Sequence, residues 1–88
     1  MALYRVLVKQ SVSKDLKKIS KKDVRRILTA IQSLAENPRP PQAKKLSWQA
    51  RYRLRQGNYR ILYSIENDEL IVCVVKVGAR RDVYRQRN

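Results

Sequence analysis

The chain has 88 residues, enough for one domain over residues 1–88, and its 21 Lys and Arg against 7 Asp and Glu give a formal charge of +14. A charge of this size on one small domain repels itself, so the composition predicts an acidic partner, either a nucleic acid or an acidic protein segment. With no His and a single Cys, the composition excludes His-based catalytic triads, His metal sites, an intramolecular disulfide and a zinc-binding cysteine cluster, so we expect no metal and no cofactor.

The first half of the chain predicts one strand and two helices. Residues 3–8 are rich in strand-forming side chains. Ser11 and Ser13 are candidate N-caps for a short helix, and Ser20 is a candidate N-cap for a second one. Apolar residues at helical spacing extend the second helix to about Glu36, where a proline-rich link stops it.

The second half predicts three strands joined by tight turns. Along residues 51–56, arginines alternate with apolar or aromatic side chains, and a two-residue alternation continues along residues 59–66. Gly57-Asn58 between them suits a two-residue type II′ loop with Gly first. A second turn is expected at residues 67–68. The apolar run over residues 70–77 is typical of a central strand covered on both faces, and Cys73 within it is expected to be buried.

These elements predict an α+β fold in the order β-α-α-β-β-β with a short C-terminal appendage. We expect one antiparallel or mixed sheet packed on a helical hairpin. The longest apolar run has six residues, far fewer than the roughly 20 that a membrane span needs, so we expect no membrane association and a cytoplasmic location.

The loop position also predicts the hairpin register, in which Arg55 lies opposite Arg60. Alternation then directs one set of side chains toward the helices: Tyr52, Leu54, Ile61 and Tyr63. Four arginines share the other face: Arg51, Arg53, Arg55 and Arg60. Like charges in opposite positions destabilise a sheet, and no acidic residue lies between Glu36 and Glu66, so we interpret this face as a binding site. The alternative is that exposed arginines protect an edge strand from aggregation.

Other cations and aromatic residues are further candidates for contact with a nucleic acid. The basic ones are Lys17, Lys18, Lys21, Lys22, Lys44, Lys45 and Arg81. For the helical lysines among them, a solvated surface that steers a polyanion is the simpler interpretation. Trp48 either covers an edge of the core or lies in a binding surface, and Tyr84 in the polar tail is a candidate for stacking on a base.

These motifs together resemble the RelE family of bacterial and archaeal toxins over nearly the whole chain. The resemblance rests on the order of elements, on Tyr52-Arg53-Leu54-Arg55, on the hairpin over residues 57–63, on the apolar strand, and on the ending over residues 77–84. It implies the toxin of a type II toxin–antitoxin module, a metal-independent endoribonuclease that cuts mRNA in the ribosomal A site and inhibits translation. It also implies a small RelB-like antitoxin with an acidic segment.

The resemblance further implies the catalytic positions Arg53, Arg55, Arg60, Arg80 and Tyr84. In such chemistry the 2′-OH of the RNA attacks the adjacent phosphate, so Arg60 is expected to clamp the phosphate and Arg80 to stabilise or protonate the leaving oxygen. Arg53 and Arg55 would hold the RNA backbone, and Tyr84 would orient the nucleotide. The best-known members carry lysines at the first pair and a longer stretch between Tyr52 and Arg60. Arginine is a poor proton acceptor, so the general base stays open.

Two other functions fit the same sequence. A ParE-like toxin shares the architecture but poisons DNA gyrase; the ending Gly78-Ala79-Arg80-Arg81 and the absence of His favour the RelE-like interpretation. A non-catalytic RNA-binding module is the other alternative, because a basic sheet face is sufficient for binding.

Overall fold

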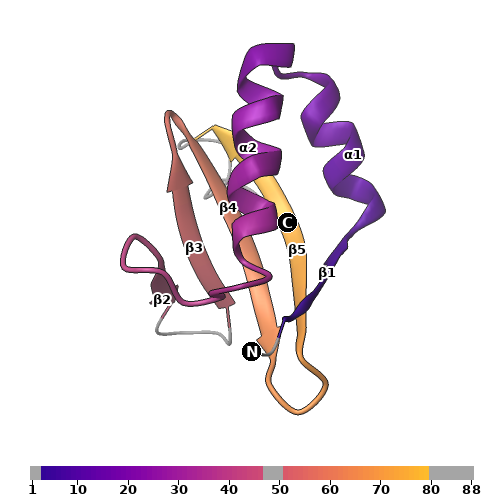
Figure 1. The fold of residues 1–88 in the computed structure, drawn as a ribbon. Helices are drawn as coiled ribbons and strands as arrows, with labels where there is room; N and C mark the ends of the chain where they lie inside the picture. The colour runs from indigo at the N-terminus through magenta and orange to yellow at the C-terminus, as the bar shows by residue number, and fades with distance from the viewer. Residues whose placement is uncertain (1–2, 47–50, 80–88) are drawn as a thin grey trace.

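A computed structural model describes residues 3–46 and 51–79 of the chain (Figure 1). The elements are β1 (Arg5–Val8), α1 (Gln10–Lys17), α2 (Lys21–Ser33), β2 (Lys44–Leu46), β3 (Arg51–Gln56), β4 (Tyr59–Glu66) and β5 (Ile71–Ala79). They build one mixed sheet in the order β1-β5-β4-β3-β2, in which β1 runs parallel to β5 and every other neighbouring pair is antiparallel. The predicted α+β fold is confirmed. None of the described helices is long and apolar enough to cross a membrane.

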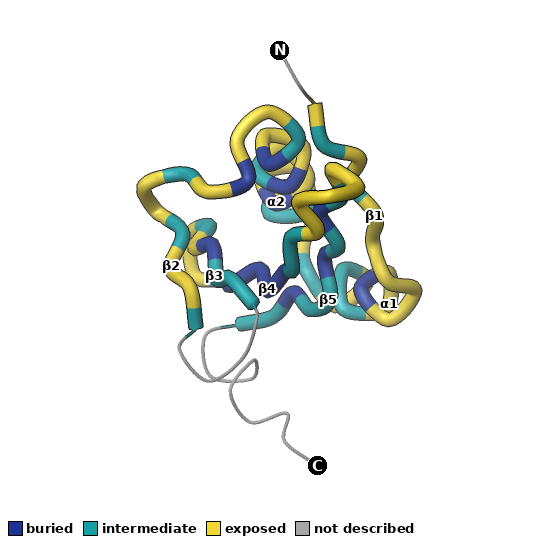
Figure 2. The backbone as a smooth tube through the Cα atoms, turned by 90° about the horizontal axis from the view of Figure 1, so that it is seen from below, coloured by how far each residue is buried: buried dark blue, intermediate teal, exposed yellow. Residues whose placement is uncertain are grey.

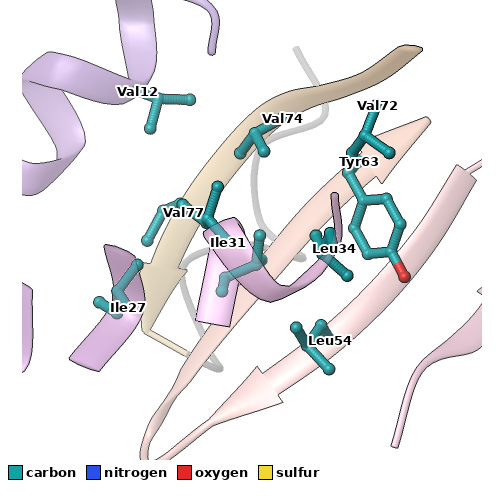
Figure 3. Close-up of a cluster of buried hydrophobic side chains, with 10 residues drawn as sticks. Val12, Ile27, Ile31, Leu34, Leu54, Tyr63, Val72, Val74 and Val77 are labelled. Atoms are coloured by element: carbon teal, nitrogen blue, oxygen red, sulfur yellow. The ribbon is translucent and has the colours of Figure 1, made fainter. Parts of the chain in front are cut away.

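The hydrophobic core lies between α2 and one face of the sheet. Its buried side chains come from both helices, the C-cap of α2 and the three longest strands: Val12, Ile27, Ile31, Leu34, Leu54, Ile61, Tyr63, Val72, Val74 and Val77 (Figure 3). In α2 the spacing of Ile27 and Ile31 puts both on the side that meets the sheet. Because burying one large apolar side chain contributes about 1.5–3 kcal/mol, this cluster is the main source of stability.

Helix α1 protects the part of β5 that β1 leaves open. The pairs between β1 and β5 end at Val8 and Val74, and the Lys9 amide donates to the Val74 carbonyl at 3.0 Å. Further along β5, the Asp15 carboxylate of α1 accepts from the Val77 amide at 3.3 Å and forms an ion pair with Lys76 at 3.1 Å. One α1 side chain therefore satisfies a strand amide that no other described strand reaches.

We predict that Asp15→Ala lowers the free energy of unfolding by about 1–3 kcal/mol, because it leaves the half-buried Lys76 and the Val77 amide without their partner. Urea denaturation measures the change. Glu69→Ala, at an exposed turn, removes the same charge and should change stability by under about 0.5 kcal/mol. Equal effects of the two substitutions would assign the loss to net charge instead.

The helices begin and end close to the expected residues, with one wrong prediction. Ser20 caps α2, its hydroxyl accepting from the Asp23 amide at 3.3 Å, as predicted, and turns continue the chain to Glu36 after α2 itself ends. The N-cap of α1 is Lys9, not Ser11 or Ser13. The helix starts there because one residue joins it to β1, which brings Val12 into the core within the first turn.

The strands add features that alternation did not indicate. Strand β2 was not predicted; it is three residues long and pairs with Arg51–Arg53 of β3. The last turn spans residues 67–70 instead of 67–68, and Leu70 adopts a positive φ of 54° there. Strand β5 is central but buries one face more deeply than the other, and Cys73, predicted to be buried, is half-buried.

Candidate functional site

The β3–β4 hairpin has the register that the sequence predicts. The pairs are Gln56 with Tyr59, Arg55 with Arg60, Leu54 with Ile61, Arg53 with Leu62, and Tyr52 with Tyr63. Gly57 adopts a φ of +61°, the left-handed value that the first position of a type II′ loop requires and that glycine reaches without steric cost. The two-residue loop therefore determines which side chains of the two strands share a face.

Four arginines lie on the face opposite the core, and we call Arg51, Arg53, Arg55 and Arg60 the arginine face. Side chains alternate between the two faces along a strand, so the neighbouring residues point to the core. These are Leu54, Ile61 and Tyr63, which are buried under α2. Figure 2 shows α2 on a single side of the sheet. The four arginines differ in exposure: Arg60 is only 4% exposed, Arg51 and Arg53 are half-buried, and Arg55 is exposed. A buried guanidinium keeps one orientation, which suits it to a fixed anion.

The neighbouring strands extend this face. Lys44 of β2 lies directly opposite Arg53, so the structure brings this predicted RNA-binding residue to the arginine face. On the other side, Arg60 is paired with Gly78 of β5, so no β5 side chain stands directly beside it. Lys76, paired with Leu62, lies on the same face, where its charge is balanced by Asp15. The sequence prediction did not include it, although it is a lone charge in the apolar run.

Acidic side chains are sparse around the arginine face in the part of the chain that the structure describes. Asp15 is engaged by Lys76, which is the one ion pair among residues 3–46 and 51–79. Along β4 the next acidic residue on the same face as Arg60 is Glu66, which is six residues away and therefore roughly 20 Å distant. Arg55 and Arg60 repel each other across the hairpin, so an anion bound there lowers the electrostatic energy of the folded protein.

The remaining site candidates that the structure describes do not gather on the arginine face. Lys17, Lys18, Lys21 and Lys22 are exposed on the two helices and the link between them. Lys45 pairs with Tyr52 and therefore lies on the opposite face of the sheet from the arginine face. Trp48, Arg80, Arg81, Tyr84 and the predicted C-terminal appendage lie outside the described residues. Tyr59, near the hairpin tip, is half-buried and packs against the core.

An aromatic cluster holds the proline-rich link against the sheet. The buried Tyr63 hydroxyl donates to the Pro38 carbonyl at 2.7 Å, and its ring stacks on Tyr52 with centroids 5.6 Å apart. Arg39 Nε donates to the Tyr52 hydroxyl at 3.1 Å. Burial raises the pKa of Tyr63 to about 12, with the neighbouring Tyr52 acting in the same direction and Arg39 opposing it. These tyrosines support the fold behind the arginine face.

The geometry favours binding and charge stabilisation at a phosphate. Directly opposite strand residues have Cβ atoms roughly 5 Å apart, so the positive charges of Arg55 and Arg60 can act on one phosphodiester together. Arg53 lies two residues along β3 and can reach the next phosphate of a strand. Among the described residues, no three His, Cys, Asp or Glu side chains cluster in a way that could hold a metal ion.

Comparison with known proteins shows that the chain is similar to toxins. Residues 6–84 match the family described as the ParE toxin of the type II toxin-antitoxin system parDE. A protein of Escherichia coli named as a RelE-like toxin is 29% identical, with 92% of this chain and 90% of the relative covered. A protein of Methanocaldococcus jannaschii named as toxin RelE1 is 28% identical, with coverage of 93% and 96%.

A solved structure agrees with these sequence relatives. The RelE–RelB complex of the archaeon Pyrococcus horikoshii OT3 contains a chain that superposes with a TM-score of 0.80 at 30% identity, covering 89% of this chain and 96% of its own. A mutant of the E. coli toxin RelE in the free state has the same fold, with a TM-score of 0.77 at 22% identity and coverage of 98% and 94%.

Proposed function

Because the chain belongs to the ParE toxin family of type II toxin–antitoxin systems, and its relatives are RelE-like toxins, we propose that it is a ribosome-dependent endoribonuclease that cleaves mRNA in the A site. The observation that carries the proposal is the buried Arg60 directly opposite Arg55, on the face of the sheet away from the core. A surface that only protects a sheet edge has no need for a buried arginine.

The chemistry requires little more than positioned cations. The 2′-oxygen of one nucleotide forms a bond to the adjacent phosphorus while the bond to the 5′-oxygen of the next nucleotide breaks, giving a cyclic phosphate and a free 5′-hydroxyl. Negative charge grows on the phosphate oxygens in between, and preorganised donors stabilise it. Arg60 is assigned to those oxygens because burial restricts its orientation, and Arg53 and Arg55 to the flanking backbone. Arg80 and Tyr84 remain assigned to the leaving oxygen and the base from the sequence resemblance alone.

The proposed inhibitor is a RelB-like antitoxin with an acidic segment. The P. horikoshii RelE is found in complex with RelB. In this chain the formal charge of +14 and the row formed by Lys44 and the arginine face offer the complementary surface for acidic side chains. An antitoxin bound there would occupy the same cations that we assign to RNA.

The deciding experiment is to induce the protein without its antitoxin and map mRNA 5′ ends against the reading frame. Cuts in frame at A-site codons, lost when ribosomes are withheld from an in vitro reaction, are the expected result. Because the matched family is described as ParE, the second candidate is a gyrase-directed toxin. Intact mRNA together with accumulation of cleaved DNA in gyrase complexes would replace the proposal by this second function.

A further inference from the structure

A second basic feature lies between α2 and the outer half of β3, apart from the centre of the arginine face. It is a groove of about 460 Å³, which we call the α2–β3 groove. Three arginines line it: Arg25 and Arg26 from α2, and Arg55 from β3. Its apolar floor includes Ala30 and Leu54, and polar side chains of the link and of the end of β3 complete its wall.

The fold explains why this groove is open. Strand β2 pairs with β3 only as far as Arg53, so residues 54–56 have no described strand on their outer side. On α2, Ile27 faces the core and is buried, whereas the preceding residues Arg25 and Arg26 are exposed and line the groove. The groove thus combines an open strand edge, whose backbone amides can donate hydrogen bonds, with a cationic helix surface.

The charge of the groove is largely uncompensated. None of its three arginines forms an ion pair with a carboxylate of residues 3–46 or 51–79. One acid, Asp23, lines a smaller adjoining cavity of about 160 Å³ together with Arg26 and the hairpin loop. Three positive charges against one negative charge make the groove a site for an anion.

We propose that the α2–β3 groove binds the phosphate backbone of RNA, as a second contact that continues from the arginine face; the inference rests on the proposed function. Arg55 belongs to both surfaces, since it lines the groove and lies opposite Arg60. An RNA strand whose phosphate is bound at Arg60 can therefore continue across the edge of β3 toward α2. The floor at Ala30 and Leu54 accommodates a ribose or base, and guanidinium planes can stack on an unpaired base.

This combination favours RNA over an acidic peptide. A peptide carboxylate needs the cations alone, whereas a nucleotide also uses the apolar floor and the amides of Gln42 and Gln56, which border the groove and can bind base edges. The RNA can be the mRNA that flanks the cleaved codon or a segment of ribosomal RNA. Both present the same backbone phosphates.

The test is a binding titration with a single-stranded 2′-O-methyl RNA oligonucleotide, which lacks the nucleophilic hydroxyl and so stays uncut. We expect the full-length double variant Arg25→Gln, Arg26→Gln to bind about tenfold more weakly at 0.15 M salt. The slope of log affinity against log salt should fall by about 1.4, the value for two lost phosphate contacts on single strands. Both residues are exposed, and an unchanged melting temperature confirms folding.

The matched control is the double variant Arg5→Gln, Lys9→Gln on and after β1. It removes two exposed charges at the opposite edge of the sheet, and we expect its salt slope to stay within experimental error of the wild-type slope. Equal losses in both double variants would assign binding to net charge and overturn the proposal. So would a groove variant that keeps full RNA affinity but loses affinity for a polyglutamate peptide.

A second arm identifies the source of the RNA. Co-sedimentation with ribosomes lacking mRNA reports ribosomal RNA contacts, and the oligonucleotide titration reports the messenger. A loss in either arm supports the groove, and full binding in both overturns it. The outcome is separable from the proposed cleavage: the groove variant loses RNA affinity whether or not the wild type cuts mRNA, and Arg60→Ala tests cleavage with the groove intact.

Discussion

Replacing Arg60 with alanine is expected to reduce ribosome-dependent mRNA cleavage by about 10²–10³-fold, the usual effect of removing one preorganised donor from a developing oxyanion. Arg60 is 4% exposed and lies opposite Arg55, so no other described arginine can take over its fixed orientation. In cells the variant should therefore permit growth when it is induced without the antitoxin. Single-turnover cleavage on programmed ribosomes measures the rate.

The conservative variant Arg60→Lys separates charge from geometry. Lysine keeps the positive charge but offers a point donor in place of the planar pair, so an intermediate loss of about 10–100-fold is expected. If the alanine variant unfolds, the lysine variant still tests the role of Arg60. Arg5→Ala, an exposed arginine on β1, is the matched control and should cleave at the wild-type rate. A folded Arg60→Ala variant with unchanged toxicity would remove this residue from the mechanism.

Tyr63→Phe is expected to lower the free energy of unfolding by about 1–3 kcal/mol at neutral pH. The substitution removes the hydroxyl that donates to the Pro38 carbonyl at 2.7 Å, which leaves a buried acceptor without its partner. The ring and its stacking on Tyr52 are retained, so the loss reports the hydrogen bond. Urea denaturation of both proteins measures the difference.

The same residue gives a prediction for alkaline pH. In the folded protein the pKa of Tyr63 is raised to about 12, chiefly by burial, so the unfolded chain loses this proton first as the pH rises. The stabilising contribution is complete below about pH 10 and is lost as the pH rises toward 12. Two pKa units correspond to about 2.7 kcal/mol.

The informative quantity is the difference in the free energy of unfolding between wild type and Tyr63→Phe, because it isolates the contribution of this one phenol. That difference should shrink from pH 9 to pH 12. Tyr59→Phe also removes one phenol, from a half-buried ring near the hairpin tip, and serves as the control. A constant difference between wild type and Tyr63→Phe over this range would contradict the assigned pKa shift.

The sequence alone determined the hairpin and the sharing of its faces. A two-residue type II′ loop with glycine in its first position permits only one pairing register for the strands on either side. Alternation of side chains then places Arg53, Arg55 and Arg60 on one face of the sheet. Helix α2 was equally predictable, because Ser20 caps it and its apolar spacing shows which side is buried. These features depend on residues close together in the chain.

The tertiary structure decided how the arginines differ and what surrounds them. Strand β2 has three residues and no alternation of its own, so only its pairing with β3 brings Lys44 opposite Arg53. The irregular register between β4 and β5 after Leu62, and the contact of Lys76 with Asp15, likewise join residues far apart in sequence. Burial of Arg60 beside an exposed Arg55, and the groove between α2 and β3, depend on how whole elements pack. Composition and charge therefore predicted an acidic partner, and local turn geometry predicted which arginines share a face of the sheet. Packing between distant segments decided which of these arginines is buried.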